Sequence, residues 1–317
     1  MKHKDTMISL VIPVFNEEEV LAMSIERMRN VMCKTGYAFE MIYIDDGSSD
    51  STWAQLEEFC KTIPELKALR FSRNFGHQPA VTAGIDIAKG DAVVIIDADL
   101  QDPPEVIPEM IAKWEEGYQV VYGKRARREG ETFMKKITAH TYYRLLKAMS
   151  AYPIPLDTGD FRLIDRRVAD VLRDMREQNR FLRGMAAWAG FKTCPVEYVR
   201  QERAAGQTHY TMKKMLGLAM NGILGFSHTP LLVPLYIGFI LLALTFLGAI
   251  AALICAIVLT VPAWLWAFLG ISCMISILLF CMGMQGAYIG RIHDEACNRP
   301  LYIVSEQADG AKPKNNQ

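Results

Sequence analysis

Four apolar runs of strand length, each followed by a polar cluster and a helix-like segment, set the strongest constraint on how this chain of 317 residues can fold. The runs cover residues 8–15, 39–44, 66–71 and 93–96. Continuous apolar runs of this length are typical of strands that are buried on both faces. Because strands that alternate with helices form parallel sheets, we predict an α/β fold with a Rossmann-like, mostly parallel sheet.

Polar side chains follow each of the four runs. They are Asn16 and Glu17, Asp45 and Asp46, Arg73 and Asn74, and Asp97 and Asp99. The carboxyl ends of parallel strands meet at one edge of a sheet, which is where open α/β sheets bind ligands. The chain has no GxG pair and no GK[ST], so it carries neither the dinucleotide fingerprint nor the P-loop. Any phosphate at this edge must be held by a metal and by side chains.

Asp97 and Asp99 lie directly after the fourth run. Side chains two residues apart on a strand share a face, so both carboxylates can bind one Mg²⁺ or Mn²⁺ and the phosphates that it carries. An acidic turn that caps the next helix is the alternative. A calcium loop of the EF-hand type is excluded, because Asp102 and Pro108 stand where that loop needs its glycine and its closing glutamate.

The following segment contains a cationic cluster and further acids. We predict a helix over 105–116, a short strand over 119–122 that leads into the cluster Lys124 to Arg128, and a helix over 132–150. A turn and strand over 157–164 then bring Asp157 and Asp160 toward the same edge, and the last strand covers 195–200. A solvated face is the alternative interpretation of such a charge run.

The carboxy-terminal third has a different composition. No charged residue lies between His228 and Arg291, and two apolar stretches, 231–261 and 263–290, flank Pro262. Their length predicts a transmembrane hairpin, and the cations on both flanks predict that both ends face the cytoplasm. We therefore divide the chain into a cytosolic domain (1–210), an amphipathic membrane-surface stretch (211–229), the hairpin (230–291) and a cytosolic tail (292–317).

Charge and cysteine content limit the partners and the compartment. The chain has 35 basic and 35 acidic residues, so nothing global favours nucleic acid as a partner. The seven cysteines are odd in number and form no CxxC, which favours reduced, structural thiols. The first apolar run is too short for a signal peptide. We expect the catalytic face to lie in the cytoplasm.

A series of short motifs runs in order along nearly the whole chain. They are VIPVFNE (11–17), DDGSSD (45–50), RNFGHQ (73–78), DADLQDPP (97–104), GDFR (159–162), QER (201–203) and NRP (298–300). With these motifs the chain resembles the inverting family-2 glycosyltransferases that load a sugar onto a polyprenyl phosphate. Bactoprenol glucosyltransferases and dolichol-phosphate mannose synthases are of this kind, and RNFGHQ with GDFR is most similar to the former.

The resemblance implies a role for each matching position. The nucleoside would be held by Pro13, Asn16, Glu17, Asp45 and Asp46. Asp97 and Asp99 would bind the metal, Mg²⁺ or Mn²⁺, with the donor diphosphate, Gln101 would lie near the sugar, and Arg203 would neutralise the leaving diphosphate. Asp157 or Asp160 would be the base or the acid that positions the acceptor, and Arg125, Arg127 and Arg128 would bind the lipid phosphate. His209 departs from the family pattern, in which lysine occurs, so the cation there is pH-dependent.

The resemblance further implies a multi-pass protein of the bacterial inner membrane, with its catalytic domain in the cytoplasm. Its expected activity is inverting transfer of a hexose, glucose from UDP-glucose, to undecaprenyl or another polyprenyl phosphate, for O-antigen or other cell-envelope modification. Transfer of mannose from GDP-mannose, or of a modified sugar, is the alternative. We also expect a homo-oligomer.

Two other functions compete with this interpretation. A processive polysaccharide synthase would need more spans and a QxxRW segment, which the chain lacks. A non-catalytic membrane scaffold is the alternative outside enzymes, and the intact DADLQ and GDFR motifs argue against it.

Overall fold

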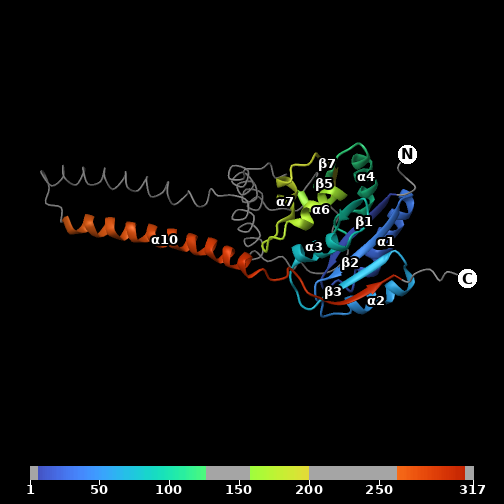
Figure 1. Ribbon diagram of the computed structural model, residues 1–317, viewed down its shortest axis with the longest axis horizontal. Helices are drawn as coiled ribbons and strands as arrows, with labels where there is room; N and C mark the ends of the chain where they lie inside the picture. Colours follow the sequence, from blue (N-terminus) through green and yellow to red (C-terminus); the bar gives the residue numbers. More distant parts are fainter. Residues whose placement is uncertain (1–5, 126–157, 200–262, 311–317) are drawn as a thin grey trace, which may run out of the picture.

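The computed structural model describes residues 6–125, 158–199 and 263–310. Within them, eight strands form one sheet in the order β7-β5-β6-β4-β1-β2-β3-β8 (Figure 1). The strands are β1 (Met7–Val14), β2 (Ala38–Asp45), β3 (Leu66–Phe71), β4 (Ala92–Ile95), β5 (Val120–Arg125), β6 (Thr158–Asp165), β7 (Thr193–Tyr198) and β8 (Val304–Asp309).

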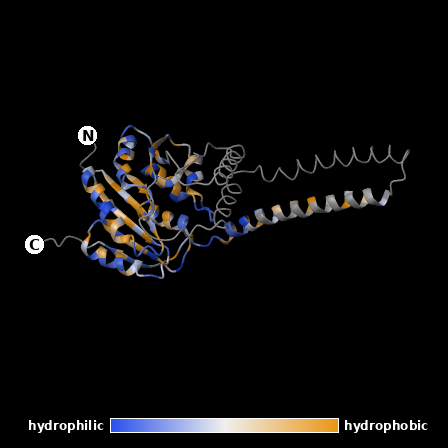
Figure 2. Ribbon diagram, turned by 180° about the vertical axis from the view of Figure 1, so that it is seen from behind, coloured by the Kyte–Doolittle hydropathy of each residue, from blue (hydrophilic) through white to orange (hydrophobic). Residues whose placement is uncertain are grey.

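Helices cover both faces of the sheet. They are α1 (Leu21–Thr35), α2 (Thr52–Thr62), α3 (His77–Ile87), the 3₁₀ turn η1 (Pro104–Val106), α4 (Ile107–Glu115), α6 (Arg166–Asp174) and α7 (Leu182–Trp188), with the long α10 (Ala263–Cys297) extending away. One apolar cluster joins α1, α2 and α4 to the sheet, and a second joins α3, α6 and α7 to it. The apolar residues accordingly concentrate between the layers (Figure 2).

The alternation of side chains between the two faces of β1 explains this arrangement. Leu10 and Ile12 belong to the first apolar cluster, whereas Val11 belongs to the second, as expected for a strand that is buried on both sides. On the second face α3 lies very close to β1, because a Cβ on Gly84 would lie 2.2 Å from Cγ1 of Val11. This close packing sets the distance of α3 from the sheet.

The predicted α/β fold with a mostly parallel sheet is confirmed. β4, β1, β2 and β3 are adjacent and parallel, so their polar clusters follow strand ends at one edge. β6 and β8 are antiparallel to their neighbours. One detail differs from expectation: β4 ends at Ile95, and Asp97 and Asp99 lie in the turn beyond it, so they are not on one face of a strand.

The predicted multi-pass location in the bacterial inner membrane is contradicted. Crossing a bilayer takes about 20 consecutive apolar residues. None of the helices in the described ranges is both long enough and apolar enough for this, and the last turns of α10 carry Arg291, Asp294 and Glu295. The amphipathic stretch 211–229 and the first predicted span lie outside the described residues, so the predicted hairpin is not supported.

The segment after α10 was expected to be a tail, yet it contains β8, which pairs with β3 at the edge of the sheet. The sequence of β8, VSEQAD, is polar and lacks the apolar pattern of a strand. The reason is its position: an edge strand that is exposed along most of its length needs no apolar face.

A buried carboxylate ties three parallel strands together at the opposite edge of the sheet. Glu40 on β2 is 4% exposed and accepts hydrogen bonds from Ser9 Oγ at 2.6 Å, Lys67 Nζ at 2.6 Å and Lys89 N at 2.7 Å. Burial raises the pKa of Glu40, but the hydrogen bonds from Lys67, Ser9 and Lys89 outweigh it and leave the pKa below its ordinary value. The Glu40 carboxyl is therefore protonated less readily in the folded protein than in the unfolded chain.

We expect Glu40→Gln to lower the free energy of unfolding by about 1 to 3 kcal/mol at pH 7, because it removes a charge-assisted bond from a buried site. Since the pKa is depressed in the folded state, the stabilisation is present above the unfolded pKa of about 4.3 and is lost as pH falls through the lower folded pKa. Urea unfolding between pH 3 and pH 7 should show the two proteins converge at the acid end.

The matched control for this experiment is Glu58→Gln. Glu58 pairs with Lys61 at 2.8 Å, but both side chains are largely exposed. Such surface pairs contribute about 0 to 1 kcal/mol. An equal loss of stability in both variants would refute the role assigned to Glu40.

Candidate active site

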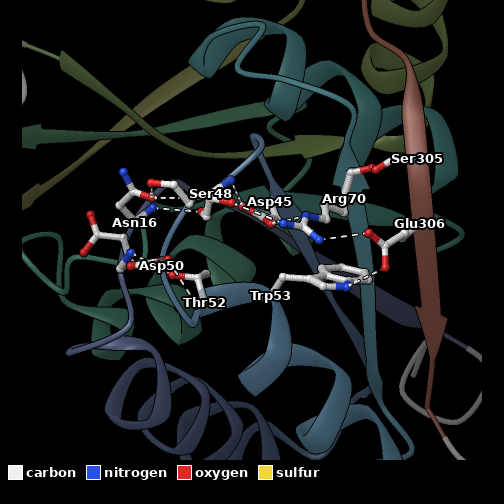
Figure 3. Close-up of polar contacts among 11 residues, drawn as sticks. Asn16, Asp45, Ser48, Asp50, Thr52, Trp53, Arg70, Ser305 and Glu306 are labelled. Carbon is white, nitrogen blue, oxygen red and sulfur yellow. Dashed lines mark hydrogen bonds and ion pairs between the residues drawn. The ribbon is translucent and has the colours of Figure 1, made fainter.

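The loops after β1 and β2 are joined by hydrogen bonds between backbone and side chains (Figure 3). Asn16 N donates to Ser48 Oγ at 2.9 Å, and Glu17 N donates to Thr52 Oγ1 at 3.0 Å. In return Ser49 N donates to Asn16 Oδ1 at 2.9 Å. Asn16 has a φ of 54°, which asparagine tolerates better than most residues. Two predicted nucleoside-binding residues, Asn16 and Glu17, are therefore held against the second loop.

Asp45 is the last residue of β2 and Asp46 follows it, and both side chains are buried. Asp45 is 0% exposed; its Oδ1 accepts from Ser48 N at 2.9 Å, and its Oδ2 lies 3.5 Å from Arg70 Nε without a hydrogen bond. Asp46 accepts from the backbone N–H groups of Phe75 and Gly76, at 2.7 and 2.9 Å. Burial raises the pKa of both carboxyls. Asp45 thus shapes its own loop, and Asp46 fixes the loop after β3.

Gly47 is required between these loops. It has a φ of 72°, and a Cβ there would lie 2.6 Å from the carbonyl carbon of Arg73. A larger residue would push apart the loops that follow β2 and β3, so the glycine of the DDGS motif is explained by close backbone approach.

Asp97, Asp99 and Gln101 follow β4 in a tight turn. Gln101 N donates to Asp99 Oδ1 at 3.1 Å, and Leu100 between them has a φ of 57°. Asp99 is 8% exposed, whereas the side chain of Asp97 is 36% exposed. Desolvation, together with the nearby charges of Asp99, Asp102 and Asp160, raises the pKa of Asp97 to about 6. An additional cation at this turn would favour the charged form of Asp97.

Asp160 on β6 lies at the centre of a network of charged side chains that includes His77, Arg162 and Arg183. Arg183 grips it with two nitrogens, Nε at 2.8 Å and Nη2 at 3.1 Å, and His77 Nε2 lies 3.3 Å away. Burial raises the pKa of Asp160, but Arg183 and His77 outweigh it and hold the pKa well below its usual range. Desolvation lowers the pKa of His77, but Asp160 and Asp97 raise it to about 9. His77 therefore bridges the turn after β4 and the network on β6.

Sequence reasoning did not assign roles to His77 and Arg183. His77 stands in the RNFGHQ motif and begins α3, so its position at a strand-to-helix junction was a usable signal. Arg183 lies on α7, a short helix that was not predicted, and nothing in its local sequence marks it. Asp102 was likewise unassigned; it is 1% exposed and accepts from Tyr198 Oη at 2.5 Å, which anchors the turn after β4 to β7.

The predicted site residues fall into two groups. Those in the described ranges are Pro13, buried in β1, together with Asn16, Glu17, Asp45, Asp46, Asp97, Asp99, Gln101 and Asp160, all on strands or strand-end loops of the sheet. Asp160 joins Asp97 through His77. Asp157, Arg127, Arg128 and Arg203 lie outside the described residues, and Arg125 is the last residue of β5.

The residues present fit a divalent cation that is bound partly by substrate. In the described ranges, no three histidine, cysteine or acidic side chains gather into a metal site. Mg²⁺ usually takes only one or two carboxylates from the protein and completes its shell with phosphate oxygens and water. Asp97 and Asp99 supply that number, and a bound cation would offset the desolvation and the neighbouring acids that raise the pKa of Asp97.

The chain was compared with solved structures. Glucosyl-3-phosphoglycerate synthase from Mycobacterium tuberculosis, solved with Mn²⁺, UDP-glucose and phosphoglyceric acid, matches 70% of this chain and 79% of that chain, with 20% identity and a TM-score of 0.48. Mannosyl-3-phosphoglycerate synthase from Rubrobacter xylanophilus matches 68% of this chain and 71% of that chain, with 16% identity and a TM-score of 0.48.

Sequence relatives are much closer. An uncharacterised glycosyltransferase of Bacillus subtilis (strain 168) is 49% identical over 301 residues, which cover 94% of this chain and 93% of the relative. The bactoprenol glucosyl transferase of Shigella phage SfII is 40% identical over 305 residues, which cover 96% of this chain and 99% of the relative. The family model for "Glycosyl transferase family 2" matches residues 9–173. The chain therefore belongs to glycosyltransferase family 2 and is a glycosyltransferase.

Proposed function

We propose that this enzyme transfers glucose from UDP-glucose to a polyprenyl phosphate with inversion at the anomeric carbon, giving a lipid-linked sugar for cell-envelope modification. The observation that carries the proposal is the joined acidic and cationic cluster of Asp97, Asp160, His77 and Arg183 beside the ends of β4 and β6. The name of the phage relative, bactoprenol glucosyl transferase, supports glucose as the sugar and a polyprenyl lipid as the acceptor.

The donor's nucleoside is assigned to the loops after β1 and β2. Asn16 and Glu17 lie in the first loop, Asp45 orders the second through Ser48 N, and Asp46 fixes the neighbouring loop after β3 through Phe75 N. Because these contacts hold the loops in place before the donor binds, less conformational entropy is lost on binding. Pro13 contributes the fixed backbone of the strand from which the first loop leaves.

The donor's diphosphate is assigned to the turn after β4. Asp97 and Asp99 would hold Mg²⁺ or Mn²⁺ there, and the cation when bound would neutralise negative charge on the departing diphosphate. Gln101, fixed to Asp99 through its backbone, would lie next to the sugar, and Arg203 would add positive charge to the leaving group. In the transition state new charge develops on the diphosphate and on the sugar, which are the groups that these side chains would contact.

The acceptor needs positioning more than deprotonation. A phosphate monoester has a second pKa of about 6 and is mostly dianionic at pH 7, so it attacks without a strong base. Asp160, whose pKa is held well below its usual range, is a weak base and serves here to orient His77 and Arg183. Asp157 remains the other candidate acid. Arg125, Arg127 and Arg128 would offset the charge of the lipid phosphate.

The proposal is tested with purified enzyme, undecaprenyl phosphate in detergent and a panel of nucleotide sugars. We expect labelled glucose from α-linked UDP-glucose to appear in the lipid fraction as the β-linked product. Efficient transfer from GDP-mannose alone would replace glucose by mannose. Nucleotide binding without transfer to any acceptor would favour a non-catalytic scaffold.

Substitution of the metal-binding carboxylates should abolish most activity. We expect Asp97→Asn and Asp99→Asn each to lower turnover by at least about 100-fold, because charge stabilisation of the leaving group is lost. Chelation should have the same effect on the wild-type enzyme, and added Mn²⁺ or Mg²⁺ should reverse it. Steady-state rates over a range of metal concentrations provide the measurement.

Asp91→Asn is the matched control for this pair. Asp91 precedes β4 at the opposite end from Asp97, is exposed, and accepts a hydrogen bond from Met7 N at 2.9 Å. Its substitution should leave metal dependence unchanged. Wild-type turnover in Asp99→Asn, with metal dependence retained, would refute the assignment.

The arginine cluster should act on the acceptor alone. A charge-assisted bond to phosphate contributes about 1.5 to 3 kcal/mol, so Arg127→Ala or Arg128→Ala should weaken acceptor use about tenfold to a hundredfold. The KM for UDP-glucose should stay near the wild-type value, because the nucleotide is assigned to other strand ends. Kinetics against both substrates decide the point. A defect in donor use instead would move these arginines to the diphosphate, and no defect would return the cluster to a solvated face.

A further inference from the structure

The segment that follows α10 returns to the sheet beside the proposed donor site. β8 pairs with the outer edge of β3 (Figure 1). In the register Glu306 lies opposite Arg70. Its approach is fixed by Tyr302, which stacks on Phe71 at a centroid distance of 5.1 Å and donates from its hydroxyl to Asp86 Oδ2 at 2.8 Å. β8 therefore joins the sheet at a defined position next to the loops that follow β2 and β3.

Glu306 makes two side-chain contacts across this edge. Its Oε1 accepts from Arg70 Nη1 at 2.8 Å, and its Oε2 accepts from the indole Nε1 of Trp53 at 3.0 Å (Figure 3). Trp53 is 4% exposed and lies in the first turn of α2, so it is a rigid support. With its two oxygens on two different partners, Glu306 fixes the Arg70 guanidinium relative to α2.

The same guanidinium reaches the loop after β2. Arg70 Nη2 donates to the Ser48 carbonyl oxygen at 3.3 Å, and its Nε lies 3.5 Å from Asp45 Oδ2. Burial raises the pKa of Asp45, and the hydrogen bonds from Ser48 and the positive charge of Arg70 oppose that rise, so Arg70 favours the charged form of this buried carboxylate. Asp45 Oδ1 in turn accepts from Ser48 N, and Ser48 Oγ accepts from Asn16 N.

From this chain of contacts we infer that Glu306 is a positioning residue for the nucleotide donor, which holds Arg70 across Asp45 and the Ser48 carbonyl so that the loops after β1 and β2 keep their binding geometry. The inference rests on the proposed function, because it takes those loops to be the nucleoside site. Glu306 touches no reacting atom in this scheme. Its loss should therefore weaken donor binding without changing the chemical step.

The test measures UDP binding by calorimetry, in the full chain with Mn²⁺ present, beside steady-state kinetics with UDP-glucose. We expect Glu306→Ala to weaken UDP binding about three- to tenfold and to raise the KM for UDP-glucose by the same factor, since one anchor of Arg70 is lost and Asp45 retains the other. The kcat at saturating donor should stay within about twofold of wild type, as expected when only uniform binding is lost.

Gln307→Ala is the matched control on the same strand. The Gln307 amide contacts Asp309, which is also on β8, so the substitution perturbs the strand without touching Arg70. It should leave UDP binding unchanged. If both variants lose thermal stability and active fraction while UDP affinity holds, β8 is a structural brace and the inference is overturned.

A double-mutant cycle tests the route through Arg70. If Glu306 acts through Arg70, Glu306→Ala should cause no further loss of UDP affinity in a protein that already carries Arg70→Ala. The same loss in both backgrounds would overturn the inference. Glucose transfer by the wild type together with unchanged UDP binding in Glu306→Ala would refute this inference alone, whereas a wild type that binds no nucleoside diphosphate would refute the proposed function and the inference with it.

Discussion

Concentrated negative charge near the carboxyl ends of four parallel strands is the constraint on which this structure depends. Asp45, Asp46 and Asp99 are all under one-tenth exposed, and Asp97 and Asp160 stand close by. A buried carboxylate is costly unless hydrogen bonds or cations compensate it. Each of these acids is compensated differently, and the differences separate framework residues from those left for a ligand.

Backbone amides and fixed cations compensate most of the group. Asp46 is held by two backbone N–H groups and Asp160 by Arg183 and His77, while Asp45 depends on Ser48 and the more distant Arg70. These contacts rigidify the loops before any ligand arrives, which is the arrangement that a preorganised site requires. Asp97 differs in exposure, because 36% of its side chain is exposed to solvent, and its pKa is raised although His77 lies 3.9 Å away. That difference is the physical basis for assigning the cation to this turn.

Local pattern was sufficient for the parallel half of the fold. The predicted strand 66–71 matches β3, and the runs that became β1, β2 and β4 were placed to within a residue or so, because strands buried on both faces must be continuously apolar. That the polar clusters share one edge of the sheet followed from parallel pairing. The proposed metal-binding carboxylates were therefore placed at this edge from the sequence, although the turn that carries Asp97 and Asp99 was taken as part of the strand.

What local pattern missed depends on contacts between distant parts of the chain. β8 pairs with β3 from more than two hundred residues away, and its polar sequence carries no strand signal because most of it faces solvent. Arg183 reaches Asp160 from α7, and Tyr198 reaches Asp102 from β7. Arg183 and Tyr198 are single side chains, and tertiary packing sets their partners. Neither periodicity nor spacing along the chain could therefore reveal these contacts.

The division of charge also bears on why the donor and the acceptor need separate cations. In the proposed reaction both substrates bring phosphate groups, and a single shared patch of positive charge would bind either one in either place. Among the cations in the described part of the chain, His77 and Arg183 already contact Asp160, so their charge is largely neutralised before substrate binds. In that reaction a cation held by Asp97 and Asp99 would recognise the diphosphate, and another cationic group would recognise the lipid phosphate. The proposed specificity for two different phosphates would then follow from which positive charges are already paired with acidic side chains.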